Sequence, residues 1–479
     1  MNNIKTISKH CLVAILVLLF LYSCVPTKNI RAVNNAIPGE YKNQLTDTVN
    51  SATLKWKDFF SDQNLIALID SALANNQELN IMLQKVQMSK NEIKARQGEY
   101  LPFIGFYAGA EIEKVGEFTR NGAVESNLNI REDEEFPEPL TNFTAGLSAS
   151  WELDVWKKLR NGKKAAVLEY LASVEGKNFM VTQLVSEIAS AYYELMALDN
   201  QLMIIEQNLD IQQSALKMVK LQKEAARATQ LAVRRFEAEV YKNQSNKFQI
   251  QQKIVETENL INFLVGRYPQ KVKRNSAYFI SKMVDTINTG LPSELLLNRP
   301  DIRKAEFELS AKKLNVKVAK ANFFPSIGLK AGIGLEAFKP KFLTSTPESL
   351  AYSLVGDVVS PLINRNAIKA EYNTANNKQL KAIFEYEKTI LKAYIEVENQ
   401  LANVQNLKES YLLKEAQVEA LTESIDLSIQ LFKSARAEYT EVLLTQREAL
   451  DSKIEIIETK RNQLLANVKL YQALGGGWN

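Results

Sequence analysis

Hydrophobic residues recur every seven positions along two long stretches of the chain. Such a period is typical of long helices that pack as coiled coils. We therefore expect one long helical hairpin over 157–265 and another over 365–474. A generic coiled-coil stalk would show the same period. The seven-residue positions are Val181, Ile188, Leu195, Leu202, Leu209 and Leu216 in the first stretch and Ile390, Val397, Val404, Tyr411, Val418 and Ile425 in the second.

Shorter stretches alternate between apolar and small or polar residues, and this period of two predicts two β-hairpins, over 103–156 and 326–361. Strands that are apolar on one face fit a membrane barrel, although a sheet with one face in water gives the same pattern. Four strands cannot close a barrel, and open edges cannot lie in lipid. Membrane strands would therefore require several copies of the chain, and three copies would supply twelve strands.

The chain repeats itself in tandem. The stretch GEYLPFIGFYAGAEIE recurs far downstream as ANFFPSIGLKAGIGLE, with Pro102 aligned to Pro325. We expect a first repeat over 63–266, which opens with a helix over 63–99, and a second repeat over 298–479, with a linker or equatorial segment over 267–297. Because proline stops a helix, Pro102 and Pro325 mark the points at which a helix gives way to a strand.

The N-terminus has the pattern of a secretory leader. Two lysines precede an apolar run of about a dozen residues, which is too short to span a membrane. The run ends in LYSC, which resembles a bacterial lipobox, so we expect a signal peptide over 1–23 and a lipid on Cys24. An ordinary signal peptide with an incidental cysteine is the alternative. Residues 24–62 would then form the lipid anchor and an extended segment.

Composition removes several functional classes. The net charge of the 479-residue chain is +4, too small to indicate a nucleic-acid partner. Removal of the leader would take away His10, the only histidine, and Cys11. Histidine-based zinc sites and Cys/His nucleophiles are then excluded. No catalytic motif appears, a carboxylate-dependent hydrolase has no support beyond the presence of acids, and we expect neither an enzyme nor a metal or other cofactor.

Three motifs carry a resemblance to a known family: LPSELLLNRPDIRKAE, ANFFPSIGL and the terminal LYQALGGGW. They look like signatures of the TolC-like outer-membrane efflux channels, in the lipoprotein branch that serves resistance–nodulation–division pumps. The resemblance covers nearly the whole chain after the leader. It implies a mostly α fold with membrane β-structure, in which a homotrimer forms a twelve-stranded β-barrel in the outer membrane, continued by a twelve-helix α-barrel in the periplasm.

The resemblance also implies a function and partners. The chain would be a passive, gated conduit that exports small molecules with a periplasmic adaptor and an inner-membrane transporter, anchored to the outer membrane through Cys24. A periplasmic coiled-coil scaffold or adaptor lipoprotein without a pore, and a channel for type I polypeptide secretion, are the alternatives. The substrate stays open, because drug, metal-ion and polypeptide export cannot be separated from the residues.

The same resemblance assigns candidate roles to particular residues. The family usually has glycine at the periplasmic helix turns, where this chain has alanine, and it places an acidic ring just before the second turn. The acidic loop 131–140 would lie at the extracellular mouth, as a solvated loop or an electrostatic filter. The candidate adaptor contacts at the turns are Ala225, Arg227, Ala435, Arg436 and Glu438, and the candidate gate residues are Asp426 and Ile429.

Overall fold

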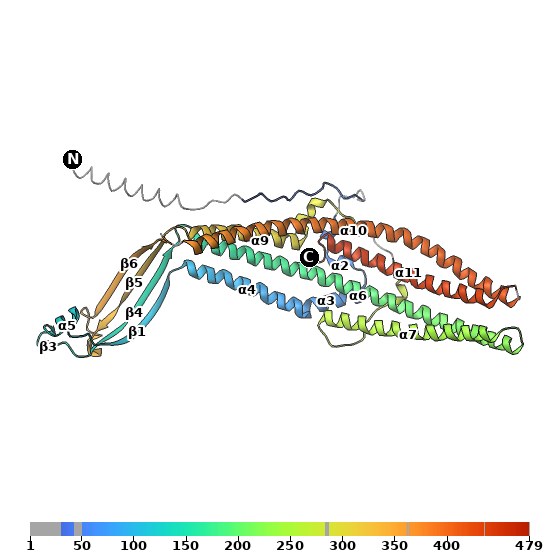
Figure 1. Cartoon of the computed structure of the whole chain (residues 1–479), viewed down its shortest axis with the longest axis horizontal. Helices are drawn as coiled ribbons and strands as arrows, with labels where there is room; N and C mark the ends of the chain where they lie inside the picture. Colours follow the sequence, from blue (N-terminus) through green and yellow to red (C-terminus); the bar gives the residue numbers. More distant parts are fainter. Residues whose placement is uncertain are drawn as a thin grey trace. The chain divides into compact units, whose positions relative to one another are not determined.

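A computed structural model describes residues 30–42, 50–282, 287–361, 363, 365–434 and 436–478. The described chain divides into two compact units, and Figure 1 shows the order of its elements. Unit 1 consists of residues 88–170 and 307–383 together with residues 30–32. Unit 2 consists of 33–87, 171–306 and 384–479. Cys24 and the expected signal peptide lie outside the described residues.

Unit 1 is built on one antiparallel sheet. Its strands are β1 (Phe103–Glu113), β4 (Leu140–Leu153), β5 (Ser326–Ala337) and β6 (Leu350–Val359), in the order β1-β4-β5-β6. Each repeat supplies one pair of neighbouring strands, and β4 joins the two pairs by pairing with β5, for example Leu147 with Ile333. The duplication therefore produces a continuous four-stranded sheet.

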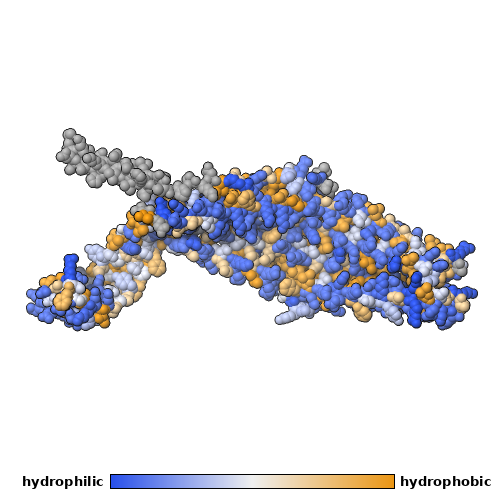
Figure 2. Space-filling view, in the orientation of Figure 1, coloured by the Kyte–Doolittle hydropathy of each residue, from blue (hydrophilic) through white to orange (hydrophobic). Residues whose placement is uncertain are grey.

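The connections at one end of the sheet carry small elements. The loop between β1 and β4 contains α5 (Arg120–Glu125), β2 (Asn129–Arg131) and β3 (Glu134–Glu135). The shorter loop between β5 and β6 contains the 3₁₀ turn η4 (Pro340–Phe342). Figure 2 shows hydrophilic residues over this loop end and a paler, more apolar surface over the strands.

Long helices make up most of the rest of the chain. The four longest are α6 (Lys158–Glu224), α7 (Gln230–Val265), α10 (Asn366–Lys433) and α11 (Tyr439–Ala473). In unit 2, α6 runs beside α7 and α10 beside α11 (Figure 1). The remaining helical elements are η1 (Ser51–Thr53), α2 (Trp56–Phe59), α3 (Gln63–Asn75), α4 (Gln77–Tyr100), η2 (Ser276–Tyr278), η3 (Pro292–Glu294), α8 (Leu295–Asn298) and α9 (Pro300–Ala321).

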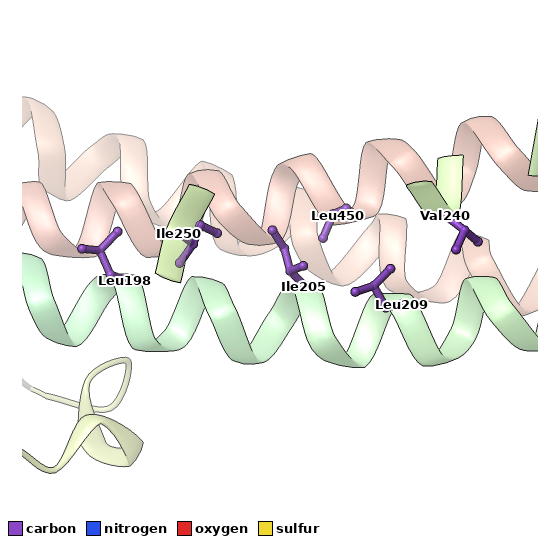
Figure 3. Packing of buried hydrophobic residues seen from close by; sticks show 6 residues of the cluster. All are labelled: Leu198, Ile205, Leu209, Val240, Ile250 and Leu450. Carbon is purple, nitrogen blue, oxygen red and sulfur yellow. The ribbon is translucent and has the colours of Figure 1, made fainter. Parts of the chain in front are cut away.

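One buried cluster of unit 2 includes Leu209 of the seven-residue pattern predicted for α6, while Leu202 and Leu216 of the same pattern pack against it and are partly buried. Leu198, Ile205 and Leu209 of α6 are buried and point toward Val240 and Ile250 of α7 and Leu450 of α11 (Figure 3). Burial of apolar side chains in such a seam provides the main stabilisation of coiled helices. The fold is thus mostly helical with one small sheet.

The single helix expected over 63–99 is wrong, because two helices meet at Asn76. Asn76 has an extended backbone (φ −60°, ψ 127°), and its side-chain oxygen accepts the backbone N–H of Leu79 at 2.8 Å. The side-chain amide donates to the carbonyl of Leu264, the penultimate residue of α7, at 2.9 Å. Asn76 therefore caps α4 and binds the end of α7, which explains why the helix is interrupted at a polar residue.

Candidate functional site

The two faces of the sheet in unit 1 differ in chemistry. Strand register places the alternating apolar residues of all four strands on one face and mainly small or polar residues on the other. The apolar face carries Ile104, Phe106, Ala108, Ala110, Ile112, Phe143, Ala145, Leu147, Ala149, Trp151, Leu153, Ile327, Leu329, Ala331, Ile333, Leu335, Leu350, Tyr352, Leu354 and Val358. Most of these side chains are at least partly exposed in the single chain. The arrangement fits a sheet with lipid on one side and water on the other.

On the polar face of the sheet, the side chain of Tyr107 lies against two paired glycines, Gly146 and Gly334. Gly146 and Gly334 are directly paired between β4 and β5, and Tyr107 is the partner of Gly146 on β1. A Cβ atom at Gly146 would lie 2.9 Å from the Tyr107 hydroxyl oxygen and 2.6 Å from a β5 carbonyl oxygen. Only glycine therefore fits at the centre of this face, where the tyrosine ring reaches across the neighbouring strands.

The polar face has more acids than bases. Its charged residues include Glu111, Glu152, Glu336 and Asp357, against Lys330. Lys330 lies 3.9 Å from Asp357, while Glu336 accepts an amide hydrogen bond from Asn142 at 2.8 Å. A conduit lined by this face would favour cations.

The acidic loop 131–140 is partly neutralised by lysines from both repeats. Glu134 forms an ion pair with Lys339, and this hydrogen bond holds the pKa of Glu134 below its usual value. Glu138 pairs with Lys114 at 3.1 Å. The loop from the first hairpin is thus joined to η4, where the Arg131 guanidinium lies 4.4 Å from the Phe342 ring centroid. The pairing weakens the acidic field that the sequence alone suggests.

Hydrogen bonds fix the points at which helices give way to strands. The chain turns at Pro102 and Pro325, one residue before β1 and β5 begin. The Trp151 indole N–H donates to the carbonyl of Tyr100 at 3.0 Å, and that of Trp156 donates to the carbonyl of Pro325 at 2.7 Å. Both tryptophans remain more than a third exposed, as expected of residues at a membrane–water boundary.

The turn between α6 and α7 closes through a left-handed residue. Ala226 has φ +59°, its N–H donates to the carbonyl of Lys223, and the Arg227 N–H donates to the carbonyl of Gln222 at 2.8 Å. This is the Schellman pattern, in which glycine is the preferred left-handed residue. The glycine-like position is therefore Ala226, one residue after Ala225.

The candidate adaptor contacts lie on exposed turns. Ala225 and Arg227 are exposed at the first turn, and Arg436 and Glu438 at the second. The Arg436 N–H donates to the carbonyl of Leu431 at 2.9 Å, which repeats the longer bond of the first turn. Ala435 lies outside the described residues.

The two gate candidates lie in different surroundings. Asp426 is exposed on α10. Ile429, one turn on, lines a mostly apolar cavity of about 430 Å³. The other lining residues are Asp210, Ile211, Ser214, Ala215, Met218, Val219, Phe236, Phe432, Lys433, Val442 and Gln446. A ring formed by these two positions would therefore expose the carboxylate of Asp426 while Ile429 packs between helices.

Two features of unit 2 had no signal in the sequence. Residues 33–42 lie along α10, where Tyr41 stacks on Tyr394 with ring centroids 5.6 Å apart and the Lys42 N–H donates to Glu398. The segment treated as a linker is held by Arg274, whose guanidinium pairs with Asp199 of α6 and Glu258 of α7. Partners so distant in sequence give no periodic pattern, so neither contact could be predicted.

No helix in the described part of the chain has the length and apolar character needed to cross a bilayer. Among the same residues, His, Cys, Asp and Glu side chains form no group of three or more suited to a metal ion.

Comparison with known proteins gives consistent matches over both repeats. A family model described as "Outer membrane efflux protein" matches residues 68–267 and 291–476. The chain is 28% identical over 426 residues to the pyoverdine export outer membrane protein OpmQ of Pseudomonas putida, covering 88% of each chain. It is 26% identical to the cation efflux system protein CusC of Escherichia coli, over 92% of this chain and 93% of that one. The open-state MtrE outer membrane channel of Neisseria gonorrhoeae superposes with a TM-score of 0.82 at 22% identity, covering 95% of this chain and 99% of that one.

Proposed function

This chain belongs to the outer membrane efflux protein family, and we propose that three copies of it form one conduit through which a periplasmic adaptor and an inner-membrane transporter export small molecules. The chain acts in efflux at the outer membrane. The relatives are named for different cargoes at nearly the same identity, so overall similarity does not select among them.

The sheet of unit 1 carries this proposal. One of its faces is apolar on all four strands, yet β1 and β6 each have only one strand neighbour in the described part of the chain. Unpaired strand edges cannot lie in lipid, because their backbone N–H and C=O groups would have no partners there. Joining β6 of one copy to β1 of the next removes both edges, and three copies close a barrel of twelve strands.

A stripe on α7 supports contact between copies. Tyr241, Phe248 and Val255 are spaced seven residues apart, and each is at least half exposed in the single chain. Large apolar side chains at this spacing form a seam that a second helix normally covers. A neighbouring copy would bury the stripe and join the helical hairpins into a tube.

Matched lysine substitutions on β6 test the conduit. Leu354 lies on the apolar face and Ser353 on the polar face. A lysine on the lipid face of a barrel costs about 2–4 kcal/mol near the bilayer centre, whereas a lumen-facing lysine is tolerated. We expect Leu354→Lys to abolish trimers and planar-bilayer conductance, and Ser353→Lys to retain both with weaker cation preference. A wild-type protein that is monomeric and does not conduct, or equal effects of the two substitutions, would refute the conduit.

The proposed conduit also gives roles to the gate candidates and to the helix turns. Asp426 and Ile429 would narrow the periplasmic entrance, with the Asp426 carboxylates raising the negative potential on the axis. The turns around Arg227 and Arg436 would contact the adaptor, and replacing both arginines by alanine should weaken binding of purified adaptor. The exposed Arg235, further along α7, provides the control substitution.

Lipid on Cys24 would hold the chain at the outer membrane. Two or more acyl chains anchor a protein stably, whereas one does not. We expect Cys24→Ser to remove incorporation of labelled palmitate into the protein; retained label would rule out this anchor.

A further inference from the structure

In unit 1 the basic residues are concentrated in the helix ends and the acidic residues in the sheet and its loops. Its helix ends, residues 88–102, 154–170, 307–325 and 360–383, contain 16 Lys and Arg against 6 Asp and Glu. The sheet and its loops, 103–153 and 326–359, contain 6 Lys and Arg against 13 Asp and Glu. The helix ends are therefore strongly basic, although the net charge of the whole chain is only +4.

Three of these cations form a basic stripe at the start of α6: Lys157, Arg160 and Lys164. Arg160 and Lys164 are four residues apart and so lie on one face of α6. Lys157 is the residue before the helix, and its carbonyl accepts the N–H of Asn161 in the first turn. All three are exposed, and among the described residues Lys157 and Lys164 form no ion pair. Lys157 has φ +60°, a conformation that costs a lysine about 1–2 kcal/mol and that glycine or asparagine would adopt more readily. The backbone conformation at position 157 therefore does not favour lysine over other residues.

Aromatic contacts place the basic stripe beside the apolar face. Trp151 belongs to that face, and its indole N–H is bonded to the carbonyl of Tyr100. The Arg160 guanidinium lies 5.5 Å from the centroid of the Tyr100 ring. Arg160 is fixed there by Asp154, whose carboxylate lies 3.1 Å from the arginine Nε. The order along the surface is thus apolar strand residues, an aromatic pair and then positive charge.

The second repeat has a similar arginine–aromatic contact but fewer lysines at the start of its long helix. Arg365 lies 5.0 Å from the ring centroid of Phe323, as Arg160 does over Tyr100. Lys369 corresponds in sequence to Lys164, but the positions of Lys157, Lys158 and Lys163 are occupied by Leu362, Ile363 and Ile368. The second junction therefore folds without lysines at these three positions. In the first repeat Lys158 pairs with Glu152 at 3.4 Å, whereas Lys157 forms no ion pair among the described residues.

We propose that the basic stripe binds the phosphate of an anionic phospholipid at the helix side of the membrane sheet. This inference rests on the proposed function, since it requires the apolar face to lie in a bilayer. Tryptophan and tyrosine mark the headgroup level of membrane proteins, and Lys and Arg just beyond that level attract anionic lipid. The first junction would hold such a lipid, whereas the second, with apolar residues at matching positions, would not.

The test counts lipids bound to the detergent-extracted full chain by native mass spectrometry. Phosphatidylglycerol and phosphatidylcholine are added to the wild type, to the double variant Lys157→Gln/Lys164→Gln, and to the control Lys369→Gln/Lys378→Gln in the second repeat. Each lysine near a headgroup contributes about fivefold to binding, so the preference for phosphatidylglycerol should fall about thirtyfold in the first variant. The control should stay within about twofold of wild type.

Several outcomes would overturn the proposal. One of them distinguishes failure of lipid binding from failure of the proposed conduit function. An unchanged preference in the first variant, or an equal loss in the control, refutes the stripe while trimers and conductance remain. Binding to peptidoglycan sacculi that requires Lys157 and Lys164, without any preference for phosphatidylglycerol, assigns the stripe to the cell wall instead. A wild-type protein that binds neither lipid and does not conduct refutes both the stripe and the proposed function.

Discussion

The left-handed alanine at the first helix turn provides a sharp local test. Ala226 has φ +59°, and its N–H and that of Arg227 close the end of α6. A left-handed conformation costs an L-residue about 1–2 kcal/mol, and glycine avoids this cost. Part of the gain is lost because glycine has more freedom in the open state. We therefore expect Ala226→Gly to stabilise the closed turn by about 1 kcal/mol.

Hydrogen exchange at the turn measures this change directly. A stabilisation of about 1 kcal/mol lowers the population of the open turn about fivefold. The amide of Arg227, which donates to the carbonyl of Gln222, should then exchange about fivefold more slowly in the full chain. Ala225→Gly is the matched control, since Ala225 does not have a positive φ and glycine there should speed exchange. Faster exchange in Ala226→Gly, or slower exchange in Ala225→Gly, would refute the assignment of the left-handed residue.

Gly334→Ala places a Cβ 2.6 Å from a strand carbonyl and should abolish trimers on gels, whereas Gly332→Ala, whose nearest neighbour is a movable side chain at 3.1 Å, should preserve them. Although burial opposes it, hydrogen bonds from two backbone N–H groups hold the pKa of Asp154 below its usual value. The ionised Asp154 carboxylate therefore stabilises the folded chain above the unfolded pKa near 3.9, and this stabilisation is lost as pH falls through the lower folded pKa. In urea unfolding, acidification from pH 5 should destabilise the wild type more than Asp154→Asn. Because it removes the carboxylates that attract cations, Asp426→Asn should lower cation selectivity and weaken block by divalent cations relative to Glu441→Gln; unchanged block would exclude the gate.

Long helices were predictable because their signal is local and repeated. The seven-residue pattern of α6 identified Ile188, Leu195 and Leu209, all of which are buried. The interruption at Asn76 was missed because a single capping residue inside an otherwise helical pattern changes the period little. Its signal was the polar Asn75–Asn76 pair, a type of residue that competes with helix for backbone hydrogen bonds.

Strand faces were predictable, but strand neighbours were not. Alternation assigns Ile333 to one face, while its pairing with Leu147 depends on two hairpins almost two hundred residues apart. The turn between α6 and α7 shows a different limit of prediction. Aligning this chain's alanines with the family's glycines locates the turn only to within a residue. The conformation of Ala226 is set by how α6 ends, which periodicity does not encode.

The free edges of the sheet have a genetic consequence. If β6 of one copy joins β1 of the next, a single gene encodes both sides of every junction between copies. A mutation that spoils one edge then blocks ring closure even when the other two subunits are normal. Such an allele should be dominant when expressed beside the wild type, and its suppressors should map to the opposite edge strand of the same gene.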